Sequence, residues 1–194
     1  MTTAFAVPDN TTAARIDNRA TYISFGLAYV IGHGTAALSR GDDPLVELPG
    51  WLPTTLLFLG LAIGTVFATI AALRSQQGAT RPEVLSARLL GLAWIVAFAA
   101  LFLAITGLTA SIDAPDLATV LWPAGSGLMV GLIYIAEGAH RRNTLHYGLG
   151  AWLALVSAFA CFCTPPGFFT ILAVLGGGGY ALATILESRR LANE

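Results

Sequence analysis

The chain has few charged side chains and no lysine. Only 11% of its 194 residues are Asp, Glu, Lys or Arg, and all ten basic residues are arginine. A soluble domain carries about 25% charged residues, because its core needs a polar surface around it. The formal net charge of −1 also lacks the basic excess of a nucleic-acid-binding protein. Two cysteines are too few for a disulfide framework. These shortages exclude an ordinary soluble domain.

Hydrophobic residues make up 56% of the chain and are grouped in six long blocks. Each block has 19 to 23 residues, close to the roughly 20 that a helix needs to cross about 30 Å of hydrocarbon. Of the 21 Asp, Glu and Arg residues, only Glu137 lies inside a block. The pattern predicts an all-α integral membrane protein with six transmembrane helices, over 21–39, 52–73, 89–109, 117–139, 144–163 and 167–186.

The arginines predict how these helices are oriented. With the amino terminus in the cytoplasm, nine of the ten arginines lie on the inner side and only Arg40 lies outside, as the positive-inside rule requires. Residues 1–20 are polar and contain Pro8, so they do not resemble a cleavable signal peptide. We expect a cytoplasmic tail over 1–20, a transmembrane domain over 21–189 and a second cytoplasmic tail over 190–194. The expected location is the cell (plasma) membrane.

Three segments of the even-numbered helices align without gaps from glycine to arginine. They read GTVFATIAALR at 64–74, GLIYIAEGAHR at 131–141 and GYALATILESR at 179–189. The alignment predicts three parallel two-helix hairpins, although abundant Gly, Ala and Ile would also produce such matches. Small residues let membrane helices pack closely. The Gly-x-x-x-Gly pairs of the second and fourth helices therefore place the even-numbered helices innermost.

Four consecutive glycines lie near the middle of the sixth predicted helix: Gly176, Gly177, Gly178 and Gly179. Such a run costs several kcal/mol of helix propensity relative to alanine. Interrupted helices at this depth form substrate sites in transporters, because they offer backbone groups to a solute. The alternative is that the glycines let a neighbouring helix approach closely.

Glu137 is the leading candidate for chemistry, because ionisable groups inside membranes usually have a function. It is expected about one turn from the cytoplasmic end of the fourth helix. There it can couple protons or gate a pathway. It can instead form a structural ion pair with Arg88, Arg141 or His146, and Arg141 stands at the favourable i+4 position.

His33 is expected in the outer half of the first helix, where it can act as a pH-sensitive gate or donate a hydrogen bond to a neighbouring helix. Axial spacing separates it from Glu137 by roughly 15 Å, so the two are not expected to touch. Cys161 and Cys163 are expected to pack as small apolar groups, and no metal or cofactor is predicted. Tyr22 is expected at the membrane–water boundary, as aromatic belts are.

Together these features predict a small multi-pass transporter or channel for a small solute, with His33, Glu137 and Gly176–Gly179 as substrate or gating candidates. The alternative is a non-catalytic membrane subunit, which anchors, senses or stabilises a larger complex such as an ABC-type transporter. No cluster of catalytic residues at one depth suggests an enzyme. Expected partners are the lipid bilayer and either further copies of the chain or a separate membrane or ATPase chain.

Overall fold

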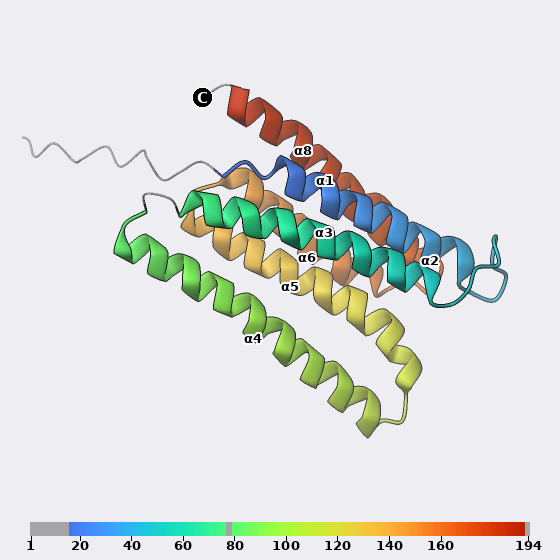
Figure 1. Ribbon diagram of the computed structural model, residues 1–194. Helices are drawn as coiled ribbons and strands as arrows, with labels where there is room; N and C mark the ends of the chain where they lie inside the picture. The colour runs from blue at the N-terminus through green and yellow to red at the C-terminus, as the bar shows by residue number, and fades with distance from the viewer. Residues whose placement is uncertain (1–15, 77–78, 193–194) are drawn as a thin grey trace, which may run out of the picture.

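The chain folds into helices joined by short connections (Figure 1). The computed structural model describes residues 16–76 and 79–192, and within those ranges no strand is present. They form six helical rods, of which the first and last are compound. The first rod is α1 (Arg19–Ala28), the π-helical turn η1 (Tyr29–His33) and α2 (Gly34–Ser39). The next are α3 (Leu52–Ser75), α4 (Arg81–Ser111), α5 (Ala118–His140) behind the 3-10 turn η2 (Pro115–Leu117), and α6 (Thr144–Ala160). The last rod is α7 (Gly167–Ile171), the π-helical turn η3 (Leu172–Gly176) and α8 (Gly177–Ala192).

Within the described residues, four helices are long and apolar enough to cross a membrane: Leu52–Ser75, Arg81–Ser111, Pro115–His140 and Gly167–Ala192. The predicted all-helical class is therefore confirmed for the described residues, and these four helices are compatible with a membrane protein. Thr144–Ala160 is apolar but shorter. The six-span arrangement stays a prediction.

Helix ends extend beyond the apolar blocks, most of all in α4. This helix begins at Arg81, eight residues before the predicted span, because Thr80 and Glu83 form a capping box at its start. The Thr80 N–H donates to Glu83 Oε2 at 2.7 Å, which satisfies one of the open amides of the first turn. Hydrophobicity locates the part of a helix that lipid can cover, whereas caps decide where the helix starts.

The two predicted tails overlap the ends of the helices. Helix α1 begins at Arg19, inside the segment expected as the first tail. Helix α8 continues to Ala192, beyond the boundary expected at residue 189. Residues 1–15 and 193–194 lie outside the described residues.

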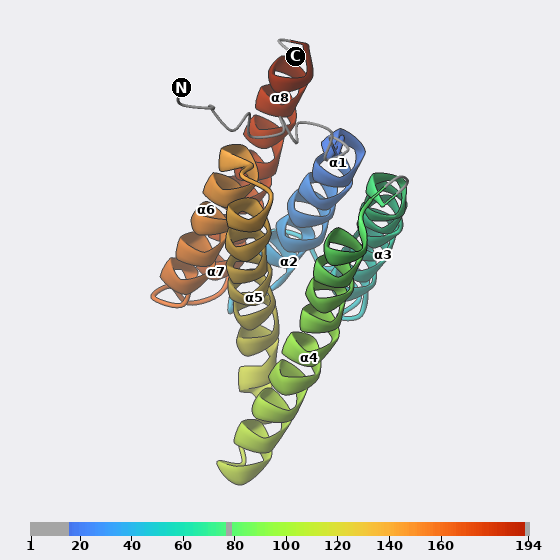
Figure 2. The ribbon, with the colours of Figure 1, turned by 90° about the vertical axis from the view of Figure 1, so that its left-hand side faces the viewer.

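The prediction that the even-numbered helices are innermost is wrong for the second rod, and the odd-numbered first and fifth rods are central as well. Helix α3, the second rod, buries only Pro53 and Gly64, whereas α6, the fifth rod, buries eight of its residues. Rods one, four, five and six form the centre, and α3 and α4 lie at the side, where α4 runs obliquely from α3 to α5 (Figure 2). Glycines show that one neighbour comes close, but they do not show how many neighbours surround a helix.

The glycines of α3 do bring it against α1. A Cβ at Gly60 would lie 2.6 Å from the Cβ of Ala28, and one at Gly64 would lie 2.5 Å from the ring of Phe25. Close approach of this kind is how small residues join membrane helices. In α3 it occurs on one side only, so the opposite side keeps large apolar residues exposed.

Helices α5 and α6 share the most extensive contact in the protein. A Cβ at Gly131 would lie 2.6 Å from the backbone oxygen of Gly150, so the two backbones nearly touch. The predicted hairpin pairs α1–α3, α4–α5 and α6–α8 are also in contact. However, α5 and α6 belong to different predicted hairpins, and the repeat stays a prediction.

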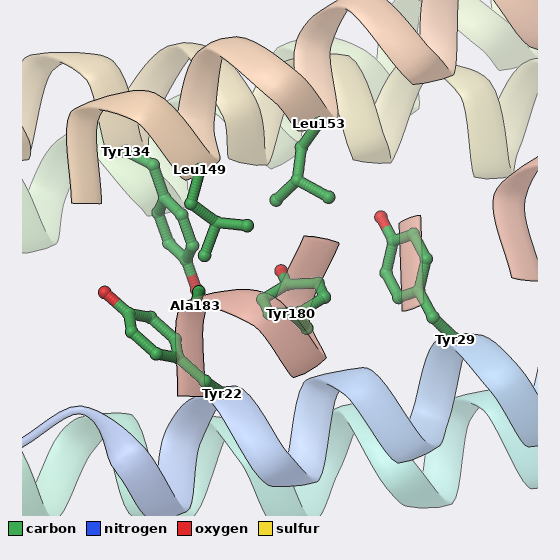
Figure 3. Close-up of a cluster of buried hydrophobic side chains, with 7 residues drawn as sticks. All are labelled: Tyr22, Tyr29, Tyr134, Leu149, Leu153, Tyr180 and Ala183. Atoms are coloured by element: carbon green, nitrogen blue, oxygen red, sulfur yellow. The ribbon is translucent and has the colours of Figure 1, made fainter. Parts of the chain in front are cut away.

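The buried side chains form two clusters along the length of the bundle. One contains four tyrosines and lies among α1, α5, α6 and α8 (Figure 3): Tyr22, Tyr29, Tyr134, Leu149, Leu153, Tyr180 and Ala183. The other is aliphatic and phenylalanine-rich: Ala36, Ala124, Val156, Ala160, Phe168, Phe169 and Leu172. The turns η1 and η3 pack against each other between these clusters.

Candidate functional site

The Glu137 carboxylate near the end of α5 is held by side chains from two other helices. Trp94 of α4 donates its indole N–H to Glu137 Oε1 at 3.1 Å. His146 of α6 places Nε2 3.3 Å from Glu137 Oε2. The carboxylate side chain is only 16% exposed, so it sits in surroundings where an unpaired charge would be costly.

Local sequence explains why His146 faces Glu137. The chain turns at Arg141–Asn143, and the Asn143 side chain caps α6 by accepting the His146 N–H at 3.0 Å. This fixes the first turn of α6, where an N-cap acceptor is normally found. The close packing of α5 and α6 then brings together two residues that are nine positions apart.

The other face of the imidazole contacts Tyr22 of α1. The Tyr22 hydroxyl lies 2.7 Å from His146 Nδ1, and the Tyr134 ring lies 4.1 Å from the imidazole, centroid to centroid. When Tyr22 donates its O–H to Nδ1, the neutral imidazole carries its hydrogen on Nε2, facing Glu137. The distance between Nε2 and the carboxylate suits an ion pair, but the two groups are not aligned as a hydrogen bond requires.

We call Tyr22, Trp94, Tyr134, Glu137 and His146 the inner polar cluster. Its members come from α1, α4, α5 and α6. Two predicted residues, Glu137 and His146, are therefore brought together. The predicted partners Arg88 and Arg141 form no ion pair with Glu137 among the described residues.

The depth expected for Tyr22 stays a prediction, but its side chain is not on the surface of the bundle. It is fully buried and points into the core (Figure 3). Its ring lies 6.4 Å from that of Tyr180, which in turn lies 5.4 Å from that of Tyr29. Tyr134 lies in the same buried cluster as these three tyrosines. Tyrosine hydroxyls therefore extend from the inner polar cluster into the middle of the protein.

Glu187 is a second buried carboxylate, which the sequence analysis did not single out because it lies one residue beyond the predicted sixth span. It is 0% exposed. Arg190 donates to both carboxylate oxygens, at 2.8 and 2.9 Å, and the backbone N–H of Asn18 donates at 3.2 Å. The spacing of Glu187 and Arg190, three residues apart on one helix, was the available signal.

His33 is buried in η1, away from the inner polar cluster. Its ring lies edge-on to Tyr29, with 4.9 Å between centroids, and is stacked with Phe169 at 6.2 Å. On Phe169, the guanidinium carbon of Arg40 lies 5.3 Å from the centroid of the ring. The position inside a π-helical turn is informative, because such turns are frequent at functional sites.

The four glycines do not interrupt their helix. The π-helical turn η3 ends at Gly176 and α8 follows at once. A Cβ at Gly176 would lie 2.6 Å from the Tyr29 ring, and one at Gly179 would lie 2.5 Å from that of Trp152. Gly177 is similarly tight against Val30, whereas Gly178 faces open space. Close packing therefore accounts for three of the four glycines, and a substrate role for them stays a prediction.

Cys161 and Cys163 are free thiols, and the described residues contain no group of three or more potential metal ligands. A cavity of about 270 Å³ lies between α4, α5 and α6 and is lined almost entirely by apolar side chains. A smaller one of about 240 Å³ lies between α1 and α3.

Comparison of the chain with family models, with curated proteins and with solved structures gave no match.

Proposed function

We propose that the protein is a small six-span transporter that couples protons to the movement of a small solute across the cell membrane. In this proposal both termini lie in the cytoplasm, and the six helices form three parallel hairpins. The observation that carries it is the largely buried pair Glu137–His146, whose partners Tyr22 and Trp94 come from two further helices.

The energetic argument starts from the cost of this pair. An ion pair in an apolar interior contributes little to stability, because desolvation offsets the attraction between the charges. Ionisable residues in membrane-spanning segments are instead typical of proton relays and solute pathways. An imidazole and a carboxylate side by side are both groups that can carry a proton.

The geometry links protonation to the way the helices are held. Trp94 joins α4 to the Glu137 carboxylate, and Tyr22 joins α1 to His146. Protonation of Glu137 removes the charge that holds the Trp94 N–H and the imidazole. We propose that this loosens α1 and α4 from the α5–α6 pair, and that such a movement opens and closes the path of the solute.

The larger cavity suggests the chemical class of that solute. It lies between α4 and the α5–α6 pair, the same helices that Trp94 and Glu137 connect. Its lining includes Leu101, Ile105 and Leu128. A volume of about 270 Å³ is slightly below the usual range for ligand pockets. A compact and largely apolar solute fits this description.

The test begins with the purified protein in liposomes that contain a trapped pH-sensitive dye. Small solutes are added one at a time, and a coupled solute changes the internal pH. We expect Glu137→Gln to abolish this change and Glu47→Gln, in an exposed loop, to leave it intact. Solute uptake by Glu137→Gln with unchanged proton movement would contradict the proposal.

The little-buried faces of α3 and α4 favour a second function. Both helices are long, and each buries very few residues against the rest of the chain. Faces of this kind suit a membrane subunit that binds another chain, in which the inner polar cluster has a structural role. Purification from the native membrane in mild detergent distinguishes the two, because a subunit brings a second chain in fixed stoichiometry and a stand-alone transporter does not.

A further inference from the structure

Glu187 and Arg190 hold the segment that leads into α1, and we call this pair the α8 clamp. Arg190 donates to both oxygens of the Glu187 carboxylate, which is 0% exposed. Each member also bonds to the backbone before α1. Glu187 Oε1 accepts the Asn18 N–H at 3.2 Å, and Arg190 donates to the Ile16 carbonyl at 3.0 Å. The last helix is therefore tied to the start of the first one by two hydrogen bonds.

Stability alone does not explain a buried ion pair at this place. Desolvation of the two charges offsets much of their attraction, so apolar side chains of similar volume often hold a core equally well. A guanidinium that grips a carboxylate through two bonds is, however, fixed in direction. The α8 clamp thus offers the backbone of residues 16–18 one rigid acceptor and one rigid donor. Such a pair is suited to fix the position of the chain that follows.

Tyr22 lies one hydrogen bond farther along this chain. Its N–H donates to the Asn18 carbonyl at 2.8 Å, in the first turn of α1. Asn18 is thus held at its N–H by Glu187 and at its carbonyl by Tyr22. The Tyr22 ring also lies beside Tyr180 of α8, with 6.4 Å between centroids (Figure 3). Tyr180, Ala183 and Glu187 are all buried and share one face of α8 by their spacing, so the same face carries the clamp and the contact with Tyr22.

The position of Tyr22 decides which nitrogen of His146 carries the hydrogen. The Tyr22 hydroxyl lies 2.7 Å from His146 Nδ1. While Tyr22 donates this bond, the neutral imidazole keeps its hydrogen on Nε2, 3.3 Å from the Glu137 carboxylate. A hydrogen bond weakens steeply as its distance and angle depart from their optimum. A small displacement of the first turn of α1 therefore releases the imidazole, which is then free to carry its hydrogen on either nitrogen.

We propose that Glu187 is a positioning residue for the inner polar cluster. Together with Arg190 it fixes the entry of α1, so that the Tyr22 hydroxyl stays bonded to His146 and the imidazole hydrogen stays on the side of Glu137. Glu187 acts through residues 16–18 and Tyr22. This inference rests on the proposed function, because the site that Glu187 positions is the proposed proton site.

The test removes the clamp without leaving a charge buried alone. A double variant, Glu187→Met with Arg190→Met, keeps apolar side chains of similar volume, an exchange that is often neutral for stability. It loses both hydrogen bonds to residues 16–18. We expect its melting temperature to stay near that of the unaltered chain. Ser188→Ala is the matched control, because the Ser188 side chain is exposed and donates to the Thr184 carbonyl within α8.

Nitrogen NMR of the full-length protein in detergent, isotopically labelled only at histidine, reports the state of His146. The signals of this residue are those missing from His146→Phe, and Tyr22→Phe shows where its Nδ1 resonance lies without the hydroxyl. We expect the resonance of the double variant to move toward that position. The ratio of bonded to unbonded Tyr22–His146 should fall about tenfold, because the loss of a hydrogen bond to a charged group changes an equilibrium by about this factor. Ser188→Ala should leave the resonance in place.

An unmoved His146 resonance in the folded double variant would overturn the proposal, because Glu187 and Arg190 would then serve the fold alone. If the double variant does not fold, Glu187→Gln gives the same comparison, since it removes the charge that fixes the guanidinium. Adding Glu187→Gln to Tyr22→Phe should shift the resonance no further. A further shift would mean that Glu187 acts by another route, and it would also overturn the proposal.

Solute-driven proton movement in liposomes tests the link to the proposed function. We expect the double variant to lower it about tenfold, in step with the bonded fraction, and Ser188→Ala to leave it unchanged. If the unaltered chain moves no protons with any solute, the proposed function fails, whereas a moved resonance still supports the positioning of Tyr22 by Glu187. If protons move equally well in the double variant and in the unaltered chain, the positioning role for the proton site is overturned.

Discussion

Replacing Tyr22 with phenylalanine removes one oxygen atom from the core and leaves the aromatic ring in place. The hydroxyl lies 2.7 Å from His146 Nδ1, and both side chains are buried. After the substitution the imidazole nitrogen has no partner in an apolar environment. Leaving a buried polar atom unpaired costs about 1–3 kcal/mol, so we expect the free energy of unfolding to fall by about 2 kcal/mol.

Unfolding by sodium dodecyl sulfate in mixed micelles measures this change. Tyr147→Phe is the control, because Tyr147 lies one position from His146 but its side chain is 47% exposed. A surface substitution of this kind should alter the free energy by no more than about 0.5 kcal/mol. Both proteins are measured at the same detergent fraction and at neutral pH.

A double-mutant cycle isolates the contact itself. His146→Phe removes the acceptor, so adding Tyr22→Phe to it should cost less than Tyr22→Phe costs alone. Residues in contact show coupling energies of about 0.5–3 kcal/mol, and we expect about 1 kcal/mol or more here. A free energy within experimental error of the unaltered chain, together with additive effects, would refute the inner polar cluster as described.

Three further predictions concern other parts of the bundle. Arg190→Ala should destabilise the protein by about 3 kcal/mol or more, because it leaves the Glu187 carboxylate buried without its cation; unfolding in mixed micelles measures this loss, and full stability would contradict the ion pair. Gly176→Ala should lower the free energy of unfolding by about 1–3 kcal/mol through overpacking. Gly178→Ala meets no neighbour and should raise it by up to about 1 kcal/mol through helix propensity. The same assay measures both, and equal effects would argue against the close packing at η3. The hydrogen bond from Arg19 lowers the pKa of Asp17 from its ordinary 3.8. This bond therefore stabilises the folded state above pH 3.8, and the stabilisation is lost as the pH falls through the lower pKa of the folded state. In a curve of unfolding free energy against pH, Asp17→Asn should remove this loss at acid pH.

The positions of the helices could be predicted because the hydrophobic blocks are long and uninterrupted. The direction in which each helix faces could not. Helices in lipid are apolar on every side, so periodicity does not distinguish a core face from a lipid face. For this reason the sequence did not predict that α6 is more buried than α3. It also did not predict that the Tyr22 side chain points into the core.

The candidate site was predictable only where its parts are close in sequence. Glu137 and His146 stand on either side of one short turn, so their pairing was among the expected alternatives. Trp94 and Tyr22 come from helices whose angular positions depend on packing, and nothing in the sequence fixes those. Glu187 was overlooked because a charge at the edge of an apolar block is normally taken as the end of the span.

The paired turns η1 and η3 have a mechanical consequence for the bundle. A π-helical turn takes up one residue more than an α-helical turn, and one residue corresponds to a rotation of about 100° around a helix axis. If the extra residue moves along the helix, the segment that it passes rotates by that step while the helix stays unbroken. Because η1 and η3 pack against each other, a step of this kind in one helix would change the side chains that it presents to the other.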